Sequence, residues 1–200
     1  MTTKDVFHLV CKHFDKQHLA VCSLGRTAEE CFHQLPHEQV LFLDCLGSIT
    51  DTAIGVSLGC PDTWVDAFDT DGSFLANLAT IYTLASLQES LSRFTLFIFD
   101  NRILESGGGK KSRAIDLDWY HMFAAWGIPV QTISNCHQLN QHLTVRPTVA
   151  TLQVIILNID NKNIPNSCQK DIDGKESKYM FKRYIHENLK EGIIRPCLKN

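Results

Sequence analysis

Residues 64–101, WVDAFDTDGSFLANLATIYTLASLQESLSRFTLFIFDN, decide how the chain is expected to fold. This stretch begins and ends with runs rich in β-branched and aromatic residues, at 64–68 and 94–99, which are typical of buried strands. Between these runs, residues 73–87 place apolar side chains along one stripe at helical spacing, which predicts a helix. Strand, helix and strand in this order form the unit from which parallel sheets are built.

The same alternation continues on both sides of this stretch. Its strands are near-continuous apolar runs, as expected when helices cover both faces of a sheet. We therefore predict a single α/β domain over residues 1–200, with a doubly wound parallel sheet of about six strands. The other expected strands are 19–23, 40–44, 130–133 and 149–157, and the other expected helices are 4–15, 27–35, 49–58, 117–126, 136–143 and 178–190.

Composition narrows the classes of function. Nineteen Lys and Arg residues against 22 Asp and Glu residues give a net charge of −3, so the chain has no basic field for nucleic acid. No apolar run approaches the ~18 residues of a membrane span, and charged residues interrupt the first twenty positions too often for a secretory signal. We expect a cytoplasmic protein that binds neither nucleic acid nor membrane.

The eight cysteines do not form a zinc-finger pattern, and no Cys-x-x-Cys pair occurs. Several, such as Cys22 and Cys45, lie within apolar runs, where a reduced thiol behaves as a small buried side chain. We expect most of them to pack in the core rather than to form disulfides or a structural zinc site.

Ligands of open parallel sheets bind at the carboxyl ends of the strands, so the loops after the strands are informative. Glycines there allow backbone amides to approach an anion, and Thr27 or Ser73 could cap a helix and donate to phosphate. The oxygens of Asp71 and Asn101 suit Mg²⁺. A diphosphate with Mg²⁺ is the expected ligand of four loops, 23–27, 45–49, 69–73 and 100–109.

Each of these residues also has an ordinary structural interpretation. Asp71 could simply begin a helix, Asn101 could form a turn, and Ile49 could be a core residue. Residues 107–111, GGGKK, could be a solvated loop, or their positive charges could attract an acidic substrate. The histidines lack a recognisable catalytic partner and are expected at the surface or in satisfied core positions.

Four segments together resemble a known family. SLGRTAEECF (23–32), LGSITDTAIGVSLGCPD (46–62), FDTDGSFLANLATI (68–81) and FDNRILESGGG (99–109) follow the order of the diphosphate-binding module of thiamine-diphosphate-dependent 2-oxoacid decarboxylases. The resemblance is to the β subunit of sulfopyruvate decarboxylase and to the C-terminal half of phosphonopyruvate decarboxylase. It implies the thiamine-diphosphate-binding fold and a requirement for thiamine diphosphate and Mg²⁺.

The resemblance also assigns roles to individual residues. Asp71, the side chain of Asn101 and the main-chain oxygen of Ile103 would bind Mg²⁺. Ile49 would hold the two cofactor rings in a bent conformation, and Glu105 would lie near the substrate. The implied catalytic residues are thus Ile49 and Glu105, and the implied cofactor-binding residues are Gly25, Thr27, Gly47, Ser48, Ile49, Gly72 and Ser73.

Enzymes of this family also need a pyrimidine-binding module, whose glutamate activates the cofactor. We expect a separate α-type subunit to supply it, so that the chain works in a hetero-oligomer on a small 2-oxoacid such as sulfopyruvate or phosphonopyruvate. Thr70, Arg102 and Lys110 depart from the family pattern. Thr70 and Arg102 motivate an alternative: a non-catalytic or regulatory subunit that retains the fold. A different nucleotide-binding α/β protein is a third interpretation, although no Gly-x-Gly-x-x-Gly follows the first strand.

Overall fold

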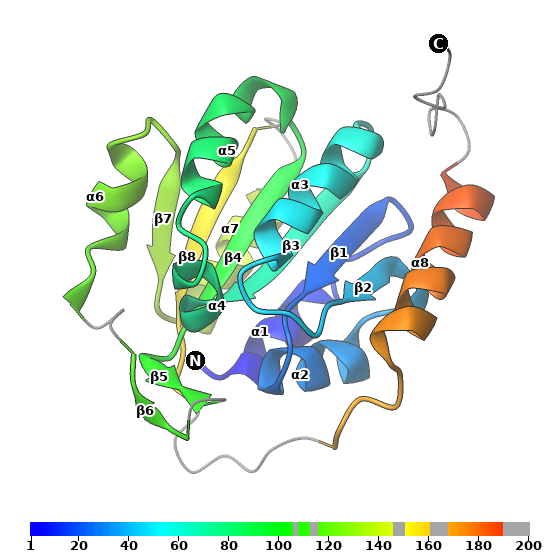
Figure 1. The fold of residues 1–200 in the computed structure, drawn as a ribbon, viewed down its shortest axis with the longest axis horizontal. Helices are drawn as coiled ribbons and strands as arrows, with labels where there is room; N and C mark the ends of the chain where they lie inside the picture. The colour runs from blue at the N-terminus through cyan, green and yellow to red at the C-terminus, as the bar shows by residue number, and fades with distance from the viewer. Residues whose placement is uncertain (106–107, 113–115, 146–150, 161–167, 190–200) are drawn as a thin grey trace.

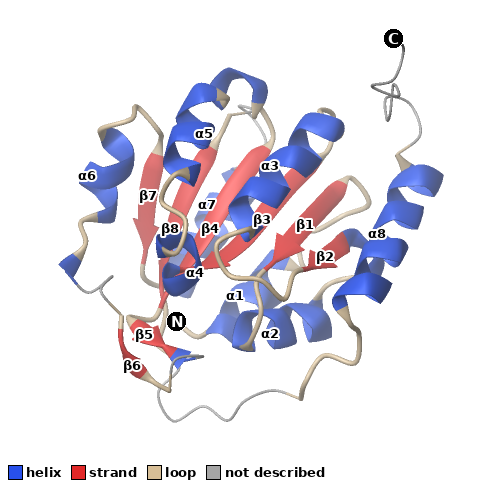
Figure 2. Ribbon diagram, in the orientation of Figure 1, coloured by secondary structure: helices blue, strands red, loops and turns tan. Residues whose placement is uncertain are grey.

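The computed structural model describes residues 1–105, 108–112, 116–145, 151–160 and 168–189. Its centre is a six-stranded sheet in the order β2-β1-β3-β4-β8-β7, in which all neighbouring strands are parallel (Figure 2). All six strands expected from the sequence are present. They are β1 (His18–Cys22), β2 (Val40–Phe42), β3 (Trp64–Thr70), β4 (Phe94–Asp100), β7 (Val130–Ile133) and β8 (Gln153–Asn158).

Helices cover both faces of this sheet, which confirms the predicted doubly wound α/β architecture (Figure 1). One face carries α3 (Ile49–Gly59), α4 (Asp71–Leu75), α5 (Thr80–Ser86) and α6 (Trp119–Ala124). The opposite face carries α1 (Thr3–Val10), α2 (Arg26–Gln34) and α7 (Cys136–Val145). The last described helix, α8 (Gly174–Asn188), packs beside β2, and short 3₁₀ turns occur at η1 (His37–Gln39) and η2 (Gln88–Ser90).

Two apolar cores, one on each side of the sheet, follow from the alternation of side chains along the strands. On β4, Leu96 and Ile98 face the core beneath α3 and α5, whereas Phe97 and Phe99 face α1 and α7. All four are buried. Burial on both faces is why the sequence of β4 is a near-continuous apolar run.

The predicted helix over 73–87 is wrong in its middle. The chain forms α4, then a tight turn over 76–79, then α5. The Asn77 side chain donates to the main-chain oxygen of Gly47 at 2.9 Å and to Asp51 Oδ2 at 2.8 Å. These contacts hold the turn against the loop after β2 and the first turn of α3, a tertiary effect that apolar periodicity does not report.

Other boundaries also differ from the sequence predictions. The first helix ends at Val10 rather than at residue 15, and the last begins at Gly174, where the Asp173 side chain accepts from two backbone amides. Residues 149–150 and 190 of the predicted elements lie outside the described residues. A two-stranded antiparallel hairpin of β5 (Ile103–Leu104) and β6 (Lys110–Lys111) was not predicted.

The described cysteines are all free thiols. Cys22 is buried as expected, but Cys45 is exposed because it lies in the loop after β2 rather than in the strand. None of the helices in the described part of the chain has both the length and the apolar character needed to cross a bilayer.

Candidate functional site

A pocket opens at the carboxyl ends of β1, β3 and β4, next to the point where the strand order changes direction between β1 and β3. This crevice is the usual ligand position in open α/β sheets. Its cavity of about 90 Å³ is lined by residues from all four loops singled out in the sequence, although the loop at 45–49 contributes only Leu46. The predicted residues that line it are Gly25, Thr27, Asp71, Gly72, Ser73, Asn101, Ile103 and Glu105.

The first turn of α2 forms one wall. Its N-cap, Gly25, has φ +72°, a left-handed conformation that favours glycine, and no side chain caps the helix there. Thr27, expected as a possible cap, instead lies inside the first turn and is buried. Arg26 brings a guanidinium group to the same wall, with its Nε 3.7 Å from Glu105 Oε2. Backbone amides at a helix start and a nearby cation favour an anionic ligand.

The opposite wall is the start of α4, where Thr70 rather than Ser73 is the cap. Thr70 Oγ1 accepts from the Ser73 amide at 3.3 Å, and Thr70 itself has an ordinary extended backbone. The Ser73 hydroxyl accepts from the Gly47 amide at 3.1 Å and also bonds to Asp69. Ser73 therefore ties the loop after β2 to the end of β3, in addition to lining the pocket.

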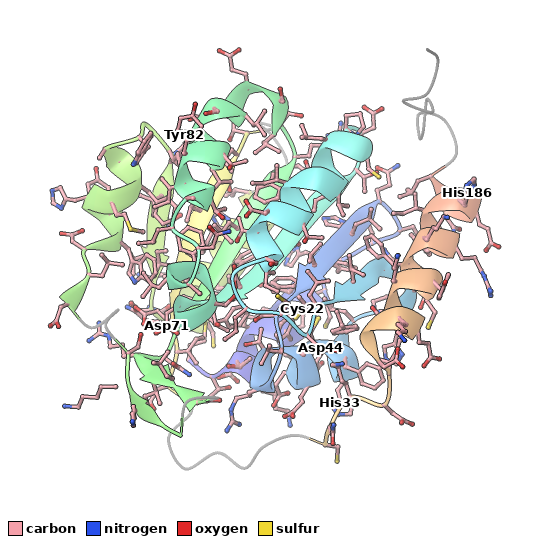
Figure 3. All side chains as sticks on the ribbon, viewed as in Figure 1. Cys22, His33, Asp44, Asp71, Tyr82 and His186 are labelled. Carbon is pink, nitrogen blue, oxygen red and sulfur yellow. The ribbon has the colours of Figure 1, made fainter. Side chains whose placement is uncertain are left out.

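Asp71 is the most unusual polar group of the pocket. Its side chain is only 2% exposed, and its Oδ2 has no hydrogen-bond partner among the described residues. Burial raises its pKa to about 6, and the nearby Asp100 adds to the increase, while the Ser112 side chain and the Gly72 amide oppose it. A buried carboxylate oxygen without a partner is costly unless a proton or a cation binds to it. Figure 3 labels Asp71, at the end of the sheet where the hairpin lies.

The loop after β4 forms the mouth of the pocket. Asn101 Oδ1 accepts from the Ile103 amide at 2.9 Å, and its Nδ2 donates to Glu105 Oε1 at 3.1 Å. Because an amide oxygen has two lone pairs, Asn101 Oδ1 can still bind a cation. Arg102 has φ +60°, so this position is left-handed, which explains why a glycine would suit it.

The hairpin approaches α4 closely at Gly72, where the end of the Leu104 side chain lies over the helix start. A Cβ atom on Gly72 would lie 2.7 Å from Leu104 Cδ2, closer than van der Waals contact allows. Gly72 thus permits β5 to cover the start of α4. This contact joins the mouth of the pocket to the wall that carries Asp71.

The loop after β2 contributes differently from the sequence prediction. Gly47, Ser48 and Ile49 do not line the pocket, and Ile49 is fully buried in the core beneath α3. That placement favours the core interpretation of Ile49. The apolar side chain that reaches the pocket from this loop is Leu46, which is 45% exposed.

Several other residues that line the pocket or contact Asp71 were not predicted from the sequence. Leu46, Arg26 and Ser23 belong to the loops that it identified, but their contribution depends on side-chain direction, which loop sequences do not reveal. Ser112, which bonds to Asp71, lies far along the chain from it and carried no motif. Its role could be recognised only from the folded hairpin.

The arrangement fits an anion held together with a divalent cation. Like Asp71 Oδ2, the Oγ of Ser23 is a buried polar atom of the pocket without a hydrogen-bond partner in the described part of the chain. No three His, Cys, Asp or Glu side chains gather into a metal cluster in the described ranges. Asp71 and amide oxygens would therefore need ligand oxygens to complete an octahedral Mg²⁺ site. A cavity of about 90 Å³ is well below the ~300–1,000 Å³ of whole small-molecule sites, so it accommodates only part of a larger ligand.

No protein-family model matches the sequence, and no curated protein matches it. A solved structure does match: an X-ray structure described as a "putative thiamin diphosphate-dependent enzyme" from Mycobacterium smegmatis. The two chains are 19% identical, with a TM-score of 0.68 over 80% of this chain and 32% of the other. The present chain therefore corresponds to about a third of that protein, and the likeness shows that the two share the α/β fold of this segment.

Proposed function

We propose that the chain is the diphosphate-binding, β-type subunit of a thiamine-diphosphate- and Mg²⁺-dependent 2-oxoacid decarboxylase. One observation carries this proposal. At the switch point of the sheet, Asp71, whose buried Oδ2 has no hydrogen-bond partner among the described residues, lines the same small cavity as the start of α2 and Asn101. The shared fold with a structure described as thiamin diphosphate-dependent gives further support.

The pocket residues divide into three roles in this proposal. The first turn of α2, Arg26 and Gly72 would hold the diphosphate, while Asp71, Asn101 and the main-chain oxygen of Ile103 would hold Mg²⁺. Thiamine diphosphate, when bound, supplies the electron sink for loss of CO₂ from a 2-oxoacid. Glu105, which is partly exposed at the mouth and held by Asn101, would face the substrate.

The hairpin favours a substrate with a second anionic group. Lys110 and Lys111 on β6 and Arg102 beside β5 are all exposed near the mouth of the pocket. Positive charges at a pocket mouth raise the local concentration of an anion. A phosphonate- or sulfonate-bearing 2-oxoacid is the substrate class that this charge supports.

An exposed apolar face supports the expectation of a partner subunit. No charged residue occurs between Asp71 and Glu89, the stretch that forms α4 and α5. Leu46, Leu78 and Tyr82 are exposed on and beside these helices. Figure 1 shows α3, α4 and α5 side by side on one face of the sheet. Exposed apolar patches of this kind mark protein interfaces, and a pyrimidine-module subunit on this face would stand next to the pocket.

Calorimetry with the purified chain tests the cofactor assignment. Thiamine diphosphate should bind in the presence of Mg²⁺ and bind much more weakly after Mg²⁺ is chelated. The titration is repeated with a candidate pyrimidine-module subunit. A folded chain that binds no thiamine diphosphate, alone or in the mixture, would instead support the non-catalytic alternative.

Activity assays test the need for a partner. Only the mixed complex should decarboxylate a 2-oxoacid, because we expect the activating glutamate from the other subunit. Turnover by a preparation that mass spectrometry shows to contain only this chain would contradict that part of the proposal.

Alanine variants of Ile49 and Leu46 test which of these two side chains bends the cofactor. Ile49→Ala should cost about 2–5 kcal/mol of folding stability if the side chain acts only in the core. Leu46→Ala should leave the melting temperature nearly unchanged and lower the single-turnover rate in the reconstituted complex. A slower rate per folded site in Ile49→Ala would restore the role that the sequence suggested for it.

A further inference from the structure

Ser112 lies at the end of the β5–β6 hairpin and is almost completely buried, with 2% of its surface exposed. Its amide donates to the main-chain oxygen of Arg102 at 2.8 Å, which closes the base of the hairpin. Its side chain hydrogen-bonds to Asp71. A buried hydroxyl from the hairpin thus reaches the carboxylate at the start of α4.

The hydrogen bond from Ser112 distinguishes the two oxygens of Asp71. Oδ2 has no partner among the described residues, so the Ser112 bond falls on Oδ1. A carboxylate that is not held on one side can rotate and present either oxygen. A hydroxyl donor on Oδ1 fixes the orientation of the carboxylate of this pocket residue and leaves Oδ2 for another ligand.

The neighbouring carboxylate is already satisfied. Asp100 Oδ2 accepts from Trp119 Nε1 at 2.9 Å, and its Oδ1 accepts from the Arg102 amide at 3.1 Å. Asp100 therefore has a protein donor on each oxygen, whereas Asp71 has one oxygen left over. Of these two acidic side chains at the strand ends, Asp71 is the one prepared to bind a cation.

These contacts connect the ends of β3 and β4 through the hairpin. The Asp100 carboxylate accepts a hydrogen bond from the Arg102 amide, and the Arg102 carbonyl accepts one from the Ser112 amide. The Ser112 side chain then hydrogen-bonds to Asp71. Moving the hairpin away from α4 would break the last contact. Binding at Oδ2 and closure of the hairpin should then favour each other.

We propose that Ser112 is a positioning residue that orients Asp71 toward a divalent cation and couples the cation to the β5–β6 hairpin. This inference rests on the proposed function, because the cation is the one that accompanies thiamine diphosphate. Residues that orient a metal ligand change metal affinity by about 10- to 100-fold when they are removed.

Mn²⁺, which shares the octahedral oxygen preference of Mg²⁺, is a suitable probe. Its affinity is measured by paramagnetic resonance of the free ion, with the full chain, saturating thiamine diphosphate and the candidate partner subunit present. Ser112→Ala should weaken Mn²⁺ binding about 10- to 100-fold. Ser112→Thr, which retains the hydroxyl, should restore most of the affinity, and Arg183→Ala, which changes an exposed side chain on α8 away from the pocket, should match wild type.

Amide hydrogen exchange provides a readout other than affinity. Mn²⁺ with thiamine diphosphate should slow exchange at the hairpin in wild type and in Ser112→Thr, but not in Ser112→Ala. Wild-type affinity in Ser112→Ala would overturn the proposal, as would equal losses in Ser112→Ala and Ser112→Thr accompanied by a lower melting temperature. If wild type itself bound no Mn²⁺ with thiamine diphosphate, both this inference and the proposed function would fail.

Discussion

The two helices that begin at the pocket, α2 and α4, satisfy their first turns in opposite ways. At α2, Gly25 provides a left-handed N-cap without any side-chain hydrogen bond. At α4, the Thr70 side chain accepts from the Ser73 amide, and the next residue, Asp71, is buried. One helix start therefore keeps its amides for a ligand, while the other satisfies an amide internally and leaves a carboxylate oxygen without a partner in the described part of the chain.

This difference suggests a division of labour between anion and cation. Amides and the Arg26 guanidinium at α2 suit the negative charge of a diphosphate, and the Asp71 carboxylate at α4 suits its Mg²⁺. The position of a helix start after a strand does not distinguish an anion site from a cation site, because α2 and α4 both follow strands of the same sheet. The capping residue of each helix makes the distinction.

The largest expected effect comes from removing the carboxylate at α4. Asp71→Ala should reduce Mg²⁺-dependent affinity for thiamine diphosphate by about 100-fold or more, because the charged ligand is lost. The fold should persist, since the variant removes a buried charge rather than an apolar contact. Calorimetry and thermal unfolding measure the two properties. Normal cofactor affinity in a folded variant would contradict the roles assigned to the two helices.

The same carboxylate should make stability depend on pH. Because burial raises the pKa of Asp71 from 3.8 to about 6, the folded protein holds this proton more tightly than the unfolded chain. The contribution is therefore favourable at low pH and is lost as pH rises from about 4 through about 6, by roughly 2 to 3 kcal/mol. Asp71→Asn should lack this loss, so its advantage over wild type should grow with pH in urea unfolding without cofactor. A difference that stays constant from pH 4 to 7 would exclude the effect.

A smaller effect is expected at α2. Arg26→Ala should weaken binding of thiamine diphosphate with Mg²⁺ about tenfold, because a charge-assisted contact to the anion is removed. Arg183→Ala on α8, where the side chain is exposed away from the pocket, is the matched control. Calorimetry compares the two variants. Equal affinities would remove Arg26 from the anion site and leave the backbone amides of α2 as its main element.

The smallest expected effect tests the cap of α4. Thr70→Ala should lower the free energy of unfolding by about 1 kcal/mol, whereas Thr70→Ser should retain most of it. Thr70→Gly, which restores the residue usual in the resembling family, should cost only a few tenths of a kcal/mol. Chemical denaturation measures all three. If Thr70→Ala were as stable as wild type, the contrast between the two helix starts would lose its energetic basis.

Much of the architecture was predictable because burial on two faces leaves a strong local signal. The runs that became β3 and β4 are buried along most of their length and rich in apolar side chains, and the positions of all six sheet strands could be predicted from runs rich in β-branched and aromatic residues. The division of the 73–87 segment into α4 and α5 was not predictable in this way. The turn between them contains Asn77, whose side-chain partners, Gly47 in the loop after β2 and Asp51 in α3, are distant in sequence.

The sequence by itself determined which strand ends carry glycine, carboxylate and amide groups, because loop chemistry is local and follows the strand pattern. Only the tertiary structure decided which of these groups meet. Folding placed Ile49 in the core and Leu46 at the pocket, and it brought Ser112 to Asp71. The physical reason is that side-chain direction and long-range hydrogen bonds depend on packing between elements, and no local pattern encodes them.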